Sequence, residues 1–496
     1  MKGTGVMEEY LLNKEYSLVL EILDYLSIEG EKGIKISSLA EKVKVSRNTL
    51  INILNDFQGD CVLNGWLEDV VLMIEHSSIV GHFQPSFHLN RIYKYYLEKS
   101  LGFRILEHLL YENFETIPFM ADEFDVSVAT LSRKLNELRE LLKTYKITLN
   151  LKNKNVLIGK ESQIRFFYFN LYWQVFEVGD WEFPEVDESE IDNRIKILEK
   201  ATSYFDGVVM MKFKIMLAIS KIRLLRGHFI DSEKEEFMID EHPMVPYEVF
   251  KETFYFSLMN VSSTLEMEHR FHYFAFCSIN SFTIEESQYP NWLMKSAKVG
   301  FCPYTIEWIR VFTDYFNVQL TPLEYNYLLV NLYYYHKFSE KFAGGAIHFG
   351  RGGQADIFSC EHSEDYNKYV GFLSQLMGSG QYQFYDLWQN NPRLTQEYCL
   401  LVKTILKNHQ PIVKLLIYSK VSKIKKQDIQ DMIRSRLSVN VQFVETIAEH
   451  PSAIISDFPV NTRYITSCPV FQFRPFQREE DWINLQTFLI NLIENS

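Results

Sequence analysis

The sequence predicts a mainly α-helical, multidomain protein with two N-terminal winged helix-turn-helix domains, two all-helical bundles and a C-terminal α/β domain. A length of 496 residues, of which 47% are hydrophobic, suits three or four domains of ordinary size. A helix-turn-helix pattern occurs twice near the N-terminus, and strands alternate with helices near the C-terminus. The predicted boundaries are 1–90, 91–162, 163–284, 285–398 and 399–496.

The first predicted helix-turn-helix spans 36–57, with the sequence ISSLAEKVKVSRNTLINILNDF. Ser37 or Ser38 is expected to cap its first helix, and Ser46 to cap the second. A β-rich stretch within 61–90 would form the wing. An ordinary helical hairpin is the alternative. The residues expected to face outward, and so to contact DNA, are Arg47, Asn48, Thr49 and Asn52.

The second predicted helix-turn-helix occupies 117–142, and a hairpin follows it at 147–158. Its second helix has a buried stripe at helical spacing, made by Val128, Leu131, Leu135, Leu138 and Leu142. Alternating apolar residues and the polar tip KNKN predict the hairpin, which would be a wing. The candidates for DNA contact are Ser127, which is also the expected N-cap, and Thr130, Arg133, Lys134, Arg139, Lys152 and Lys154.

Charge separates this region from the rest of the chain. Residues 127–160 contain eight basic and two acidic residues, whereas the whole chain has a formal net charge of −13. A basic segment in an acidic protein is what binding to phosphate backbones requires. We therefore expect one continuous basic surface here, the alternative being that these charges merely solvate a helix and a hairpin.

The sequence from 163 to 398 is nearly all helical in pattern and predicts two bundles. In the first bundle, FKIMLAISKIRLLRGHFI predicts a helix that ends at Gly227, so that His228 is partly exposed. In the second, His336 lies near the end of an aromatic-rich helix. The glycine-rich segment 344–353 lacks the residue order of a phosphate-binding loop and is expected to be a flexible loop.

Several classes of protein and site are not expected. The six cysteines show no CxxC spacing, so neither a metal site nor a disulfide framework is predicted. The sequence has no signal peptide and no apolar run near 18 residues, so we expect a cytoplasmic protein without a membrane span. No catalytic motif is present, so neither an enzyme nor a cofactor is predicted.

The segments SLAEKVKVSRNTL, MADEFDVSVATLSRKLNEL and KIRLLRGHFI and the tail beginning KLLIYS resemble the Mga/AtxA family of virulence regulators. This resemblance implies that the bundles are PTS-regulation domains (PRDs) and that the tail is similar to a phosphotransferase EIIB domain. It implies a homodimeric transcription factor, joined through the EIIB-like and PRD-like domains, that binds double-stranded promoter DNA. HPr or another phosphotransferase-system donor would phosphorylate a histidine. His228 is the best match, His336 the candidate in the second bundle, and His269 and His272 the reserves.

One departure from the family pattern concerns the tail. Phosphate-carrying EIIB domains have a cysteine after the first strand, whereas this sequence has Ser419 and Lys420. Because serine offers no low-pKa thiolate, we expect the tail to serve association and not phosphotransfer. Two alternatives remain: an RNA-binding antiterminator with PRDs, which would begin with a small β-rich module, and an enzyme that uses the α/β domain.

Overall fold

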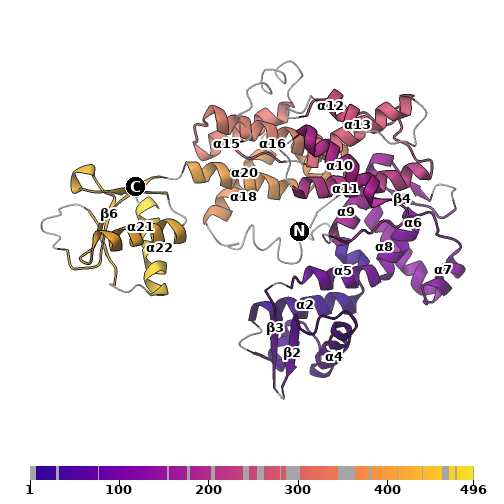
Figure 1. Cartoon of the computed structure of the whole chain (residues 1–496), viewed down its shortest axis with the longest axis horizontal. Coiled ribbons are helices and arrows are strands. Elements are labelled where there is room, and N and C mark those ends of the chain that lie inside the picture. The colour runs from indigo at the N-terminus through magenta and orange to yellow at the C-terminus, as the bar shows by residue number, and fades with distance from the viewer. Residues whose placement is uncertain are drawn as a thin grey trace. The chain divides into compact units, whose positions relative to one another are not determined.

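The computed structural model divides the chain into two compact units, Met1–Glu397 and Tyr398–Ser496 (Figure 1). It describes residues 7–29, 33–75, 77–85, 87–152, 156–175, 179–202, 207–237, 245–253, 262–279, 281–285, 302–344, 364–378, 382–409, 411–437, 440–460, 468–474 and 478–494. The predicted tip residue Lys154 and most of the glycine-rich segment 344–353 lie outside these ranges. Helices dominate the first unit, as the sequence predicts.

The first winged domain has the order helix, strand, two helices and a two-stranded wing. Helix α1 (Met7–Leu11) precedes this domain, whose elements are α2 (Lys14–Glu29), β1 (Ile34–Lys35), α3 (Ile36–Lys42), α4 (Arg47–Leu63), β2 (Val70–Ile74) and β3 (Ser78–Phe83). The antiparallel sheet has the order β1-β3-β2. The expected cap at Ser37 or Ser38 is wrong. The chain passes directly from β1 into α3, so Lys35 takes the cap position without a side-chain hydrogen bond.

The second winged domain is built from α5 (Asn90–Lys99), α6 (Leu101–Leu110), α7 (Ile117–Glu123), α8 (Val128–Thr144), β4 (Thr148–Leu149) and β5 (Leu157–Ile158). The short strands pair antiparallel, with Thr148 opposite Ile158. Leu131, Leu135, Leu138 and Leu142 are buried as predicted. The prediction that Val128 extends this stripe is wrong, since its side chain is 49% exposed and the first turn of α8 projects from the core.

Two groups of helices complete the first unit. The first bundle comprises α9 (Glu161–Val175), α10 (Glu188–Thr202), α11 (Gly207–Leu225), α12 (Tyr247–Thr253) and α13 (Ser262–Ile279). The second bundle comprises α15 (Pro303–Phe316), α16 (Pro322–Lys341), α18 (Glu364–Gly378) and α19 (Tyr382–Asn390). Helix α13 of the first bundle packs on α16 of the second, and the unit boundary falls inside α20 (Leu394–Asn408).

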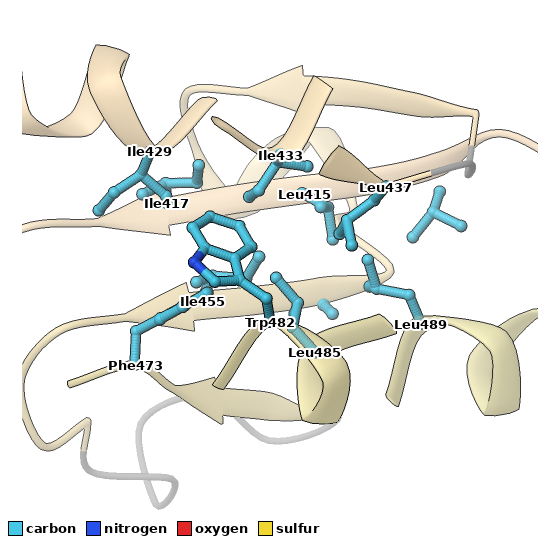
Figure 2. Packing of buried hydrophobic residues seen from close by; sticks show 12 residues of the cluster. Leu415, Ile417, Ile429, Ile433, Leu437, Ile455, Phe473, Trp482, Leu485 and Leu489 are labelled. Carbon is cyan, nitrogen blue, oxygen red and sulfur yellow. The ribbon is translucent and has the colours of Figure 1, made fainter. Parts of the chain in front are cut away.

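The C-terminal unit is a small α/β domain with a parallel sheet, as the sequence predicts. Its elements are β6 (Val413–Tyr418), α21 (Lys423–Arg436), β7 (Val441–Val444), the 3-10 helix η3 (Ile447–Glu449), β8 (Ala453–Ser456), β9 (Val470–Gln472) and α22 (Glu479–Glu494). The strand order is β7-β6-β8-β9, and all pairs are parallel. Figure 2 shows the core, in which Trp482 and Leu485 of α22 and Ile433 of α21 meet Leu415 of β6.

Candidate nucleic-acid interface

The two helix-turn-helix motifs share one local geometry. Each turn contains a residue in the left-handed region, Lys44 with φ 57° and Asp125 with φ 52°. The residue after it closes the turn: the amide of Val45 donates to the carbonyl of Ala40, and the amide of Val126 to that of Ala121, both at 2.9 Å. The small alanine allows the two helices to approach. The second motif is thus a structural repeat of the first.

Each second helix of the two motifs begins at a serine N-cap. Ser46 Oγ accepts a hydrogen bond from the Thr49 amide, and Ser127 Oγ from the Thr130 amide, both at 3.1 Å. In each motif the serine and threonine hydroxyls also share a hydrogen bond, of 2.7 and 2.9 Å. The caps satisfy amides that the first helical turn leaves free, so they hold the leading end of α4 and of α8 in shape.

The outward face of α4 agrees with the residues predicted from sequence, since Arg47, Asn48, Thr49 and Asn52 are all exposed. On α8, Arg133 is exposed as predicted. Further exposed residues share its face but were not among the candidates, among them Ala129, Asn136, Lys143 and the acidic Glu140. A helical projection centred opposite Leu131 and Leu138 would have found them.

Lys134 and Arg139 do not lie on that outward face. The Lys134 side chain is only 12% exposed, and its Nζ donates to the Tyr10 carbonyl at 3.1 Å and pairs with Glu137 at 2.6 Å. Arg139 donates to Asn136 Oδ1 at 2.5 Å and reaches the Leu149 carbonyl of the wing at 3.5 Å. Because consecutive helical residues are about 100° apart, these side chains and Arg133 point to different sides of α8.

The expectation of one continuous basic surface is therefore wrong. Arg133 and Lys143 face outward from α8, and Lys152 is exposed at the wing. Lys146 instead donates to Asn390 Oδ1 of the second bundle at 2.8 Å. Lys154 is outside the described residues, so its place on the wing stays a prediction.

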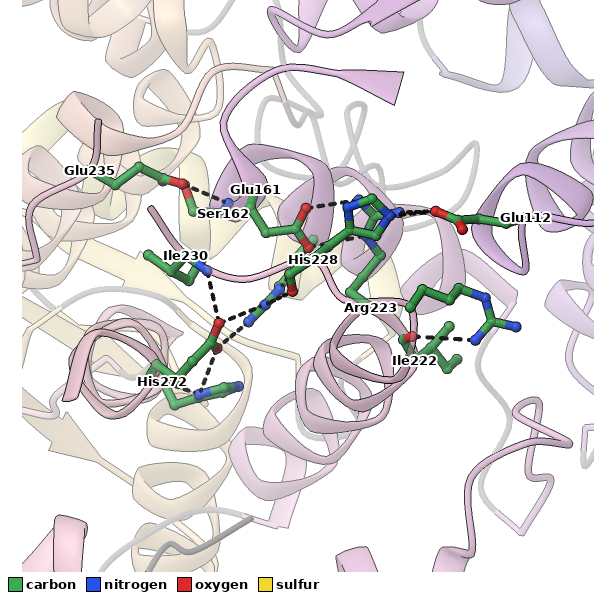
Figure 3. Close-up of polar contacts among 12 residues, drawn as sticks. Glu112, Glu161, Ser162, Ile222, Arg223, His228, Ile230, Glu235 and His272 are labelled. Carbon is green, nitrogen blue, oxygen red and sulfur yellow. Dashed lines mark hydrogen bonds and ion pairs between the residues drawn. The ribbon is translucent and has the colours of Figure 1, made fainter. Parts of the chain in front are cut away.

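A network of ion pairs joins the second winged domain to His228 of the first bundle (Figure 3). The His228 ring nitrogen Nε2 is hydrogen-bonded to the carboxylate of Glu112, which follows α6. Arg223 of α11 binds Glu161 through two contacts, at 2.8 and 3.0 Å. Burial alone would raise the pKa of Glu161, but the charges of Arg223 and then Arg165 outweigh it and hold that pKa below its usual value.

Arg165 fixes the position of the backbone at His228. Its guanidinium binds Glu268 at 2.5 and 2.9 Å and donates to the carbonyl of His228 at 3.1 Å. Glu268 in turn accepts from the Ile230 amide at 2.9 Å. The His228 side chain is 16% exposed and lines an open cleft of about 830 Å³, which Leu157–Lys160 of the wing region also line. This partial exposure agrees with the sequence prediction.

The other three candidate histidines are too buried to reach a phosphodonor in this conformation. His269, His272 and His336 are 4%, 0% and 0% exposed. His336 Nδ1 hydrogen-bonds Thr305 Oγ1 at 2.7 Å, and burial lowers its pKa to about 3. Burial, with the charge of Arg165, also lowers the pKa of His272 well below its usual value. All three imidazoles are buried in the core, so the expectation that His336 serves the second bundle as an acceptor has no accessible ring to support it.

Comparison with known proteins places the second helix-turn-helix in a family. The family model of the Mga helix-turn-helix domain matches residues 85–172. This chain carries an Mga-type helix-turn-helix domain. The matched segment includes α5 to α8, the wing and most of α9, and therefore Glu112, Glu161 and Arg165 of the ion-pair network. His228 and Arg223 lie beyond its end.

Three curated relatives agree with this assignment. A protein of Streptococcus pneumoniae serotype 4 named as a trans-acting regulator is 20% identical over 46% of this chain and 45% of its own. The capsule synthesis positive regulators AcpB and AcpA of Bacillus anthracis are 24% and 21% identical, over 45% and 44% of this chain and the same shares of their own. The match thus spans slightly less than half the length of each relative. The resemblance to the Mga/AtxA family is confirmed.

In the C-terminal unit, Ser419 takes part in a structural contact. Ser419 Oγ donates to Asp457 Oδ2 at 2.7 Å, and the amide of Lys420 donates to Asp457 Oδ1 at 2.8 Å. The carboxylate therefore closes the turn after β6.

Neither a membrane helix nor a metal cluster is found in the part of the chain that the structure describes. No described helix is long and apolar enough to cross a membrane. The described histidine, cysteine and acidic residues form no group of three or more that could hold a metal ion.

Proposed function

We propose that this chain is a DNA-binding transcriptional regulator in which α4 and α8 are the recognition helices. The observation that carries the proposal is the repeated motif: two helices with the same serine cap and exposed polar faces, the second within an Mga-type domain. The leading end of such a helix fits the major groove of duplex DNA. Arg47 and Arg133 are the side chains that we expect to contact the duplex most directly.

A salt titration of duplex binding tests this proposal. Fluorescence anisotropy would compare the wild type with Arg47→Ala and Arg133→Ala, and with Arg310→Ala as the matched control. Arg310 is a helical arginine whose side chain is 58% exposed, and it lies in the second bundle. If each arginine contacts a phosphate, each loss lowers the slope of log affinity against log salt by about 0.9. Unchanged affinity and slope in both variants would reject these helices as the DNA-reading elements.

The remaining candidates have a smaller part in this interface. Asn48, Asn52 and Lys152 can add contacts because they are exposed. Ser127, Thr49 and Thr130 act first through the caps. Lys134 and Arg139 brace α8 against α1 and the wing, so their substitution should affect the position of α8 more than the charge that faces DNA.

We further propose that phosphorylation of His228 regulates the protein. A phosphohistidine donor such as HPr would break its own N–P bond and form a new one on the His228 ring. The product carries up to two negative charges beside Glu112, which favours separation of the second winged domain from the first bundle. Incubation with a phosphorylated donor should label the wild type and not His228→Ala. Equal labelling of both proteins would exclude this histidine.

The resemblance to PRD regulators also supports a homodimer, for which the C-terminal unit is the candidate interface together with the bundles. Light scattering of the full chain, with and without phosphorylation, would test this proposal. The antiterminator alternative has no feature in its favour, since residues 7–29 form helices α1 and α2 and no small β-rich module begins there.

A further inference from the structure

The end of α8 is enclosed by aromatic side chains. Tyr145 is the C-cap of α8 and is only 4% exposed. Its ring contacts those of Phe167 and Phe166 on α9, with centroid distances of 5.0 and 6.3 Å. Phe166 stacks in turn on Phe342, which follows α16, at 4.6 Å. An aromatic chain thus runs from the recognition helix to the second bundle.

Gly344 of the second bundle lies directly against Tyr145. Its φ of +79° is in the left-handed region, and a Cβ added there would come within 2.8–2.9 Å of three carbons of the Tyr145 ring. Real Cβ atoms do not approach other atoms so closely, and a left-handed backbone is unfavourable for a residue other than glycine. Glycine is therefore required for this close approach.

Four hydrogen bonds hold the junction together. The Gly344 amide donates to the Asn390 carbonyl at 2.7 Å, and Lys146 Nζ donates to Asn390 Oδ1 at 2.8 Å. Gln163 of α9 makes reciprocal hydrogen bonds with the amide and carbonyl of Ala343, both at 2.8 Å. These hydrogen bonds therefore join the second bundle to the winged domain: the segment after α16 and the end of α19 bind the end of α8 and the start of α9.

We infer that Gly344 and Asn390 are positioning residues, through which the second bundle sets the position of the end of α8 and of the wing that follows. The consequence for DNA rests on the proposed function. Glu112 ties the other end of the same domain to the first bundle, so the Mga-type domain is held by both bundles at separate points. A change in the packing of the second bundle would then move the recognition helix without altering any of the residues that we propose to contact DNA.

Gly344→Ala in the full chain tests this inference, with Gly378→Ala as the control. A Cβ at Gly378 meets no atom of the described residues within 4 Å. We expect Gly344→Ala to weaken duplex binding at least tenfold, to leave the circular dichroism spectrum unchanged, and to speed hydrogen exchange of the last amides of α8. Gly378→Ala should match the wild type in all three. Tyr145→Ala should reduce the affinity of the Gly344→Ala protein no more than it reduces the affinity of the wild type, because the two substitutions act on one contact.

Hydrogen exchange separates a failure of this inference from a failure of the proposed function. If the wild type binds no duplex, the proposed function fails, and exchange at the end of α8 still decides whether the second bundle holds that helix. Wild-type exchange or wild-type affinity in a folded Gly344→Ala protein would overturn the inference. Should Gly344→Ala fail to fold, Asn390→Ala removes the Lys146 contact without steric overlap, and the same two outcomes apply to it.

Discussion

Replacing His228 by aspartate should drive the first bundle and the second winged domain apart. The wild-type imidazole is hydrogen-bonded to the Glu112 carboxylate. An aspartate at the same position places a second carboxylate against it. Two unit charges about 5 Å apart repel by roughly 3 kcal/mol at an effective dielectric constant of about 20. Because the Glu112 side chain is 43% exposed, solvent and salt should reduce this to about 1–2 kcal/mol.

A double-mutant cycle measures that repulsion. Urea unfolding and duplex affinity would be recorded for the wild type, His228→Asp and His228→Ala, each with and without Glu112→Gln, at low and at high salt. We expect His228→Asp to lose about 1–2 kcal/mol of unfolding free energy, and most of this loss to disappear when Glu112 is already glutamine. High salt should shrink the effect.

The reasoning would be refuted if His228→Asp and His228→Ala were equally stable, with or without Glu112→Gln. That result would mean that Glu112 does not respond to charge at His228. The proposed effect of phosphorylation would then need another route to the recognition helix.

Three further predictions concern the caps and the buried charges. Ser127→Ala should cost about 1 kcal/mol of unfolding free energy in denaturant, because the Thr130 amide loses its acceptor, whereas Ser127→Asp should retain most of it. Arg165→Met should cost about 3–5 kcal/mol, since Glu268 would stay buried without its cation; a loss under 1 kcal/mol would contradict this. Stability should fall as the pH drops from about 6.5 to about 5.5, because the unfolded chain protonates His336 near its ordinary pKa whereas the folded protein, with a pKa of about 3, does not. Relative to His336→Gln, the wild type should lose about 1 kcal/mol over that interval, and parallel pH profiles would refute the assignment.

Local patterns in the sequence were sufficient to predict the main helices and strands. The leucine spacing of α8, the serine caps of α4 and α8, and the alternation of strands and helices in the tail each depend on residues close together in the chain. The same holds for His228, which is partly exposed because its helix ends just before it. Such features need no knowledge of distant partners.

Charge counting was less reliable, because a lysine does not reveal its partner. Lys134 and Lys146 add to a basic segment in the sequence, yet one is bound by Tyr10 and Glu137 and the other by Asn390. Similarly, His336 follows the pattern of a histidine near a helix end but is sealed under Tyr304 and Thr305. Both outcomes depend on contacts between residues far apart along the chain.

The sequence of this protein determined its winged helix-turn-helix motifs, its helical body and its parallel C-terminal sheet, since periodicity and capping are local properties. Tertiary packing alone determined which charges face solvent, that His336 is buried, and that Gly344 lies against Tyr145. The physical reason is that solvation and close contact depend on the distance between atoms in space, and hydrophobic periodicity carries no record of that distance.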